Sequence, residues 1–207
     1  MNLSNLIKSY VFYTFSAFGI SLTIKASIGV SSFNSMNLAI ANAYDIKIGS
    51  VTIVFNMIFL AGYMLMTKFK NKQKYIIQAI SVLFFGILIN SFTYTLLANF
   101  NPSNYLQSIL IMSIGTIISG LSVGMIINYD QITFPLESLC IEISKISAIP
   151  FIKLRYLVDI ISVLVSIILS LTYKMPIFVR EGTLISMFLL SYAMNLPKAI
   201  ASKKIAA

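Results

Sequence analysis

The stretch that decides the fold is YIIQAISVLFFGILINSFTYTLLANFNPSNYLQSILIMSIGTIISGLSVGMIINY, residues 75–129, which contains no charged residue. A helix that crosses the hydrocarbon core of a bilayer needs roughly 20 apolar residues, so this stretch is too long for one crossing. It breaks at residues 99–104, NFNPSN, because asparagine, proline and serine favour a turn. The stretch therefore predicts two transmembrane helices joined by a short external turn.

The composition of the whole chain agrees with a membrane protein. Of its 207 residues 58% are apolar and only 10% are charged, whereas a soluble domain carries about a quarter charged residues. The chain has no histidine and one cysteine, which excludes histidine-based catalysis, Cys–Cys zinc sites and a disulfide within the chain. We expect no enzyme activity, no metal and no cofactor. The basic residues are dispersed between apolar blocks, so they favour membrane topology over nucleic-acid binding.

Further uncharged blocks lie at residues 9–24, 48–67, 156–173 and 182–196. With the two helices of residues 75–129 they predict an all-α protein with six transmembrane spans. Two stretches, residues 26–44 and 130–149, are only moderately apolar and carry many serine, asparagine and acidic residues. Each predicts a short helix that is either re-entrant or interfacial.

Cytoplasmic loops of membrane proteins carry an excess of lysine and arginine, and this rule decides between models with six and with eight spans. With six spans and both termini in the cytoplasm, 11 basic residues lie inside and 4 outside, whereas eight spans give 7 and 8. The inside set is Lys8, Lys68, Lys70, Lys72, Lys74, Lys145, Lys153, Arg155, Lys198, Lys203 and Lys204. The outside set is Lys25, Lys47, Lys174 and Arg180. We therefore predict six spans, with residues 201–207 as a cytoplasmic tail.

The chain also shows a weak internal repeat. Aligning residues 19–40 with residues 120–141 gives five identities in 22 positions, which chance similarity between helices of like composition also produces. Each half, residues 1–98 and 105–200, would hold three spans and one short helix. Because three is odd, the second half would be inverted relative to the first, an arrangement typical of secondary transporters.

Four segments resemble a known family. They are residues 19–32, GISLTIKASIGVSS; 48–52, IGSVT; 155–159, RYLVD; and 180–184, REGTL. Together they resemble the YczE/YitT-like bacterial integral membrane proteins. The resemblance implies a multi-pass protein of the bacterial plasma membrane, with transport as a plausible role. In one departure, Asp130 stands where the repeat would place a small residue equivalent to Gly29.

The starts of the two short helices are the candidate substrate site. The first N–H groups of a helix lack partners within it, and the positive end of the helix dipole favours a polar or anionic ligand. We expect a shared cavity for a small neutral-polar or anionic solute. Its candidate residues are Gly29, Ser31, Ser32, Asn34, Asn56, Thr133 and Asp159. Glu137 and Glu142 would either relay protons or be ordinary solvated acids.

Other polar and small residues point to structural roles. Arg155 and Asp159 lie one helical turn apart and form a predicted charge pair, which is either functional or a neutralised pair at the interface. Gly120 and Gly124 would let two helices approach closely, and Asn90 and Asn195 would form hydrogen bonds between helices.

The function that we predict is that of a small-solute transporter with a site between the two halves. The alternatives are a substrate-binding membrane subunit of a multi-component uptake system, or a membrane scaffold that moves nothing. Whether the chain forms a homo-oligomer or joins a partner subunit is left open.

Overall fold

The computed structural model describes residues 3–129 and 132–205, and all regular elements in these residues are helical. Asp130, the departure noted in the repeat, lies outside the described residues. The elements are α1 (Leu3–Ala26), α2 (Ser32–Ala43), α3 (Ile48–Met66), α4 (Lys72–Ser91), the π-helical turn η1 (Phe92–Leu96), α5 (Tyr105–Tyr129), α6 (Pro135–Ser147), α7 (Phe151–Thr172) and α8 (Glu181–Ile205). The all-α prediction is confirmed.

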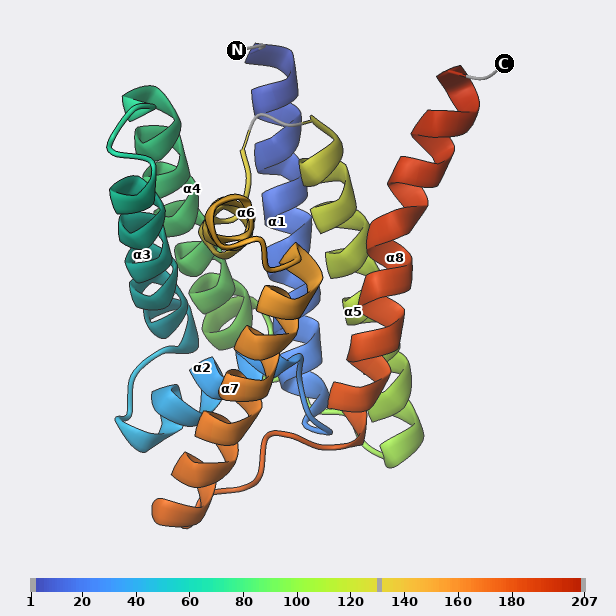
Figure 1. The fold of residues 1–207 in the computed structure, drawn as a ribbon. Coiled ribbons are helices and arrows are strands. Elements are labelled where there is room, and N and C mark those ends of the chain that lie inside the picture. Colours follow the sequence, from blue (N-terminus) through green and yellow to red (C-terminus); the bar gives the residue numbers. More distant parts are fainter. Residues whose placement is uncertain (1–2, 130–131, 206–207) are drawn as a thin grey trace.

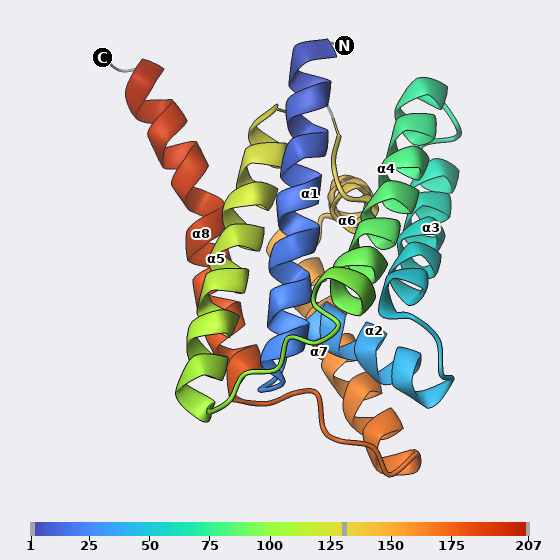
Figure 2. The same cartoon turned by 180° about the vertical axis from the view of Figure 1, so that it is seen from behind.

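The long helices form a bundle around α1 and α5. These two helices run antiparallel, side by side (Figures 1 and 2). Helix α4 packs on α1 and on α3, and α8 packs on α5. The N-terminus, the C-terminal end of α8 and the turn between α3 and α4 all lie at the upper end of the bundle in Figure 1.

The short helices α2 and α6 lie across the long ones, and α6 is seen end-on in Figure 1. Helix α2 packs on α3 and α7, and α6 packs on the same two helices. Pro135 stands at the start of α6, where its missing N–H costs nothing, and Ala148 ends the helix in a left-handed conformation with φ 58°. Both helices are therefore held between long helices of the bundle.

In the part of the chain that the structure describes, four helices are long and apolar enough to cross a membrane: α3, α4 with η1, α5 and α7. The predicted first and last spans, α1 and α8, are equally long but are not among these four. Helix α1 buries several hydroxyl side chains, which lower its hydropathy: Ser9, Ser16, Ser21 and Thr23. Because α4 and α5 cover α1, these side chains need not face lipid.

The outer faces of the bundle are apolar. On α7 the exposed side chains recur every three or four residues, as on one face of a helix: Leu157, Ile160, Ile161, Leu164, Ile168 and Leu171. The opposite face of α7 buries Ser162, Ser166 and Ser170. Apolar side chains outside and small polar ones inside are the pattern of a helix between lipid and protein. The chain is a multi-pass membrane protein.

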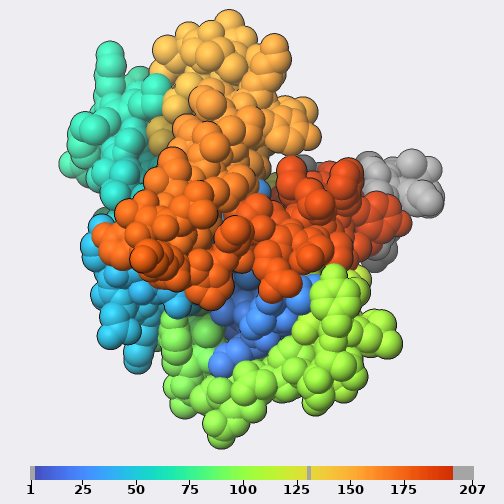
Figure 3. All heavy atoms as spheres, turned by 90° about the horizontal axis from the view of Figure 1, so that it is seen from below, coloured from blue at the N-terminus to red at the C-terminus, as the bar shows by residue number. Residues whose placement is uncertain are grey.

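At the lower end of the bundle, the loop after α1 is tied to the start of α8. The Gly182 N–H donates to the Ile28 carbonyl at 2.8 Å, and Arg180 Nη1 donates to the Ser27 carbonyl at 3.1 Å. Gly29, the next residue after Ile28, has φ +108°. A Cβ added there would lie 3.0 Å from the backbone nitrogen of Arg180. Figure 3 shows this end from below, with the connection from α7 to α8 running across it.

Candidate functional site

The first turns of α2 and α6 are brought to the same helix, α7, by the packing of the bundle. Helix α2 begins with Ser32, which is buried, and α6 carries Glu137 in its first turn. The Asp159 carboxyl of α7 interacts with the Ser32 hydroxyl. Both Arg155 and Asp159 lie close enough to Glu137 to affect its charge. We call Ser32, Glu137, Arg155 and Asp159 the charge cluster.

Arg155 and Asp159 form an ion pair within α7. Arg155 Nη1 donates to Asp159 Oδ1 at 3.1 Å, and the two side chains are 29% and 21% exposed. The pair therefore carries no net charge, and the Asp159 carboxyl also interacts with Ser32. Because Ser32 is the first residue of α2, this interaction joins the start of α2 to α7.

Glu137 is the charged member without such a partner. Its side chain retains some exposure, but its Oε2 atom is buried and has no hydrogen-bond partner among residues 3–129 and 132–205. Burial raises the pKa of the Glu137 carboxyl above its ordinary value of 4.5. The Arg155 charge and a backbone hydrogen bond at Glu137 itself oppose this rise, and the Asp159 charge adds to it. The carboxyl therefore sits where a proton or another hydrogen-bond donor would stabilise it.

A second buried polar group without a hydrogen-bond partner among the described residues lies near the start of α6. The Tyr13 side chain of α1 is 1% exposed, and its hydroxyl has no hydrogen-bond partner. Its ring lies 4.7 Å from that of Phe134, just before α6, and its hydroxyl lies within electrostatic reach of the Glu137 carboxyl. Buried polar groups are normally hydrogen-bonded, so the Tyr13 hydroxyl and the Glu137 carboxyl are candidates for contact with a polar solute.

Sequence reasoning left Glu137 as a solvated acid or a proton relay and did not identify Tyr13. A signal was present, because Glu137 lies two residues after a proline that starts a short helix. A re-entrant α6 would bury that first turn. Tyr13 gave no comparable signal, because aromatic residues are common in transmembrane helices.

The remaining candidates on α2 take different positions. Ser31 precedes α2 and makes no side-chain cap, and Asn34 is buried on the helix. Gly29 lies against the start of α8, where it serves the backbone contact described above. Gly29 therefore contacts α8 and is not a member of the charge cluster, although it lies near the start of α2.

Asn56 is buried on α3, the helix on which both short helices pack, and its Nδ2 donates to the Thr52 carbonyl at 2.9 Å. Thr52 also accepts a hydrogen bond from Asn37 of α2, at 3.2 Å. Asn37 is fully buried and its Oδ1 is unpartnered. The polar interior thus includes Asn37, which sequence reasoning did not single out.

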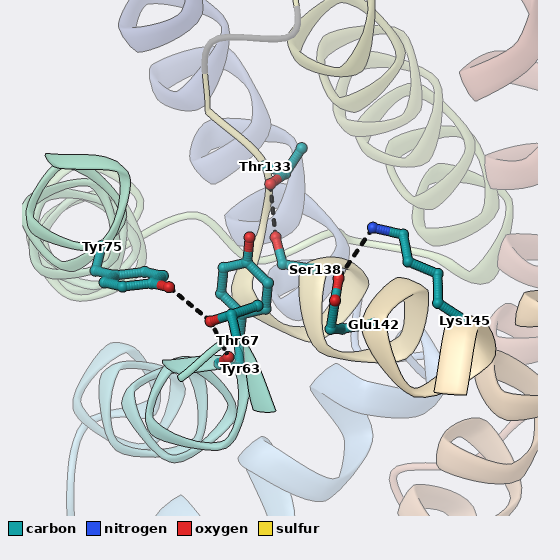
Figure 4. A network of polar contacts seen from close by, with 7 residues as sticks. All are labelled: Tyr63, Thr67, Tyr75, Thr133, Ser138, Glu142 and Lys145. Carbon is teal, nitrogen blue, oxygen red and sulfur yellow. Dashed lines mark hydrogen bonds and ion pairs between the residues drawn. The ribbon is translucent and has the colours of Figure 1, made fainter. Parts of the chain in front are cut away.

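Thr133 is engaged in a different network. Its hydroxyl lies 2.6 Å from the Ser138 hydroxyl, a contact drawn in Figure 4, and Gln78 of α4 donates to both hydroxyls at 3.1 and 2.9 Å. Gln78 also donates to the Thr133 carbonyl at 2.9 Å. Thr133 therefore connects the start of α6 to α4.

The four predicted packing residues divide into three groups. Gly120 and Gly124 lie against α8, where added Cβ atoms would come within 2.6 Å of Ala193 Cβ and 2.5 Å of the Met194 carbonyl oxygen. Asn90 accepts from the Gly49 N–H at 2.8 Å, at the start of α3. Asn195 is exposed and donates to a carbonyl of its own helix.

Two surface cavities lie at opposite ends of the bundle. One, of about 540 Å³, lies at the start of α8 around Arg180 and Leu184. The other, of about 430 Å³, lies between the α3–α4 turn and α6. Neither is lined by a member of the charge cluster. Within the described residues, no three Cys, Asp or Glu side chains gather as a metal site would require.

Comparison with known proteins supplies the family. The Bacillus subtilis protein named "Uncharacterized protein YyaS" is 23% identical over 171 residues, covering 83% of this chain and 81% of YyaS. The Bacillus subtilis "Uncharacterized membrane protein YczE" is 25% identical over 130 residues, covering 62% of this chain and 58% of YczE. No solved structure matches the chain. The resemblance to YczE-like membrane proteins is confirmed. Residues 5–198 match the family of unknown function DUF6198, so the chain belongs to that family.

Proposed function

We propose that this protein is a secondary transporter for a small polar solute, with its binding site at the charge cluster. The observation that carries the proposal is the buried, unpartnered Glu137 Oε2 at the start of α6, within electrostatic reach of the equally unpartnered Tyr13 hydroxyl. An acid inside a membrane protein is costly and is retained where it has a task. The proposal involves no catalytic step, metal or cofactor.

The arrangement of the helices supports a transporter. We propose six spans, counting α1 and α8, in two inverted halves. Helices α1 and α5 are antiparallel and meet through reciprocal contacts of Gly19 and Gly115. Each short helix also packs on the third helix of the other half, α2 on α7 and α6 on α3. Inverted halves with their site at the interface, formed by ends of interrupted helices, are typical of secondary transporters.

The distribution of basic residues supports an orientation. Lys68, Lys70 and Lys74 lie at the α3–α4 turn, at the end of the bundle that also holds the N-terminus and the end of α8. Because basic residues favour the cytoplasmic side, we propose that both termini are cytoplasmic. The relatives in Bacillus subtilis favour a bacterial plasma membrane as the location.

The chemistry of the site favours a solute with N–H or O–H donors. The Arg155 charge is already matched by Asp159, whereas Glu137 Oε2 has no hydrogen bond. An anion would face the Glu137 carboxyl, so a neutral or cationic donor group fits better than the anionic solute among the sequence expectations. Neither of the two cavities described above is lined by the charge cluster, so we propose that the solute enters between the two halves when they separate.

Uptake into proteoliposomes tests the proposal. The purified protein is reconstituted and offered a panel of labelled amines, amides, polyols and carboxylates. We expect transport of a donor-bearing solute, lost in Glu137→Gln and Asp159→Asn. Glu181→Gln is the matched control, because Glu181 is exposed and pairs with Arg180 at 3.4 Å, outside the charge cluster.

Two outcomes would count against the proposal. If a transported solute is handled equally by wild type and both cluster variants, the site is wrong. If the protein binds a panel member without transporting it, a substrate-binding subunit is the better interpretation. If it neither binds nor transports any member, a membrane scaffold is the better interpretation.

A further inference from the structure

The cavity between the α3–α4 turn and α6 is lined mainly by positively charged side chains. Its volume is about 430 Å³, and its lining includes Lys68, Lys70, Lys74 and Lys145, with Glu142 as the acid among them. Glu142 is paired with Lys145 at 3.0 Å. Within the described residues no ion pair engages Lys68, Lys70 or Lys74. Three ammonium groups around one hollow therefore lack a counter-charge from the chain.

The turn that carries these lysines is fixed by hydrogen bonds. The Tyr75 hydroxyl lies 2.6 Å from Thr67 Oγ1 and accepts from the Asn71 N–H at 3.2 Å. Figure 4 shows Tyr75 pointing toward Thr67. The Phe69 N–H donates to the Met64 carbonyl at 3.0 Å. A fixed turn holds its charged side chains around the cavity at a lower cost in entropy than a mobile one.

The cavity also joins parts that are far apart in sequence. Residues of the α3–α4 turn form one side, and Glu142 and Lys145 of α6 form the other. Tyr63, which also lines it, is buried against Tyr75 with ring centroids 5.6 Å apart. An anion bound here would contact α6 and the α3–α4 hairpin together, and so would hold them at one separation.

From the cavity, its unmatched lysines and its fixed turn we propose that it binds a phosphate group. A phosphate accepts several N–H and O–H donors at once and has the charge to match the ammonium groups. The phosphate comes either from an anionic lipid headgroup, since the cavity lies at the end of two transmembrane helices, or from a soluble phosphate. This inference does not depend on the proposed transport.

Thermal unfolding of the full-length protein in a neutral detergent tests this site. Unfolding is followed by the reactivity of Cys140, the single cysteine, which is 3% exposed in the folded protein. The midpoint Tm is measured against added phosphatidylglycerol, phosphatidylcholine, inorganic phosphate, and sodium chloride at equal ionic strength. The variants are Lys70→Gln/Lys74→Gln and, as a control of equal charge change at the other end, Lys47→Gln/Lys174→Gln.

We expect one phosphate source to raise the Tm of the wild type and of the control in a saturable way. Removing two lysines should weaken that apparent affinity about 30-fold. Stabilisation by phosphatidylglycerol alone identifies a lipid headgroup, and stabilisation by inorganic phosphate identifies a soluble ligand. Phosphatidylcholine and chloride should have little effect.

A second variant keeps the test decisive if the double lysine variant does not fold. Glu142→Gln removes the acid from the cavity wall and should tighten the binding of the same phosphate source. The inference is overturned if neither source stabilises the wild type beyond phosphatidylcholine or chloride. It is also overturned if both double variants respond alike, or if Glu142→Gln weakens binding.

Discussion

Gly19 of α1 and Gly115 of α5 contact each other reciprocally, because a Cβ on either would lie 2.6 Å from the carbonyl oxygen of the other. Helices separated by so short a distance gain close van der Waals contact between backbones, which is how small residues stabilise helix pairs in membranes. The contact lies at the centre of the bundle and fixes the separation of its two antiparallel helices.

Gly115→Ala should therefore destabilise the protein by about 1 to 3 kcal/mol, because overpacking forces the two backbones apart. Gly62→Ala is the control, since its Cβ would lie 3.3 Å from the end of the flexible Leu139 side chain. The comparison is made by unfolding in a denaturing detergent, followed by circular dichroism. Equal midpoints for the two variants would show that the glycine contact does not limit the helix separation.

Asn90→Ala should cost about 1 kcal/mol, the value typical of a lost helix cap. The Asn90 amide accepts from the Gly49 N–H and donates to Ser50 Oγ at 3.3 Å, so it satisfies the start of α3 from a different helix. Asn195→Ala removes only a bond within α8 and should change stability by a few tenths of that amount. The stability of both variants is measured by the same unfolding experiment. If Asn195→Ala loses as much stability as Asn90→Ala, Asn90 does not act as a cap for α3.

Glu137 should make stability depend on pH. Its folded-state pKa is raised by burial from 4.5, so the folded protein binds the proton more tightly than the unfolded chain does. Stability from this group is complete below pH 4.5 and is lost as the pH rises through the raised folded value. Glu137→Gln should flatten the Tm profile across that window relative to Glu181→Gln, which removes an exposed carboxylate. A wild-type Tm that rises across the window more than that of Glu137→Gln would reverse the sign and refute the prediction.

The proposed orientation predicts the accessibility of two turns. In a Cys140→Ala background, which has no other cysteine, a cysteine at Ser103 should react with an impermeant maleimide added to intact cells. A cysteine at Asn71 should react only after the membrane is permeabilised. The opposite pattern of labelling would place both termini outside.

The break in the uncharged stretch of residues 75–129 shows what sequence alone predicts well. Asparagine, proline and serine act through local backbone preferences, and residues 99–104 indeed fall between η1 and α5. The short helices α2 and α6 likewise fall within the two predicted stretches, because their polar composition cannot span a bilayer.

Glu137 and Thr133 show what the sequence could not settle. Both lie near the start of α6, yet Glu137 is within electrostatic reach of Arg155 and Asp159 of α7, whereas Thr133 bonds to Gln78 of α4. Which side chain meets which helix depends on how α6 is rotated between its neighbours, and that is decided by packing over the whole bundle. The same holds for α1. Its buried serines are compatible with a transmembrane helix because α4 and α5 cover them, and the sequence does not show that packing.

The bond between Gly182 and Ile28 has a consequence for how the protein is made. Ile28 leaves the ribosome before α2 to α7 are made, whereas Gly182 belongs to α8, which follows all of them. The Ile28 carbonyl must therefore wait for its partner until α8 has been translated. A nascent chain that stops before α8 keeps the lower end of the bundle open.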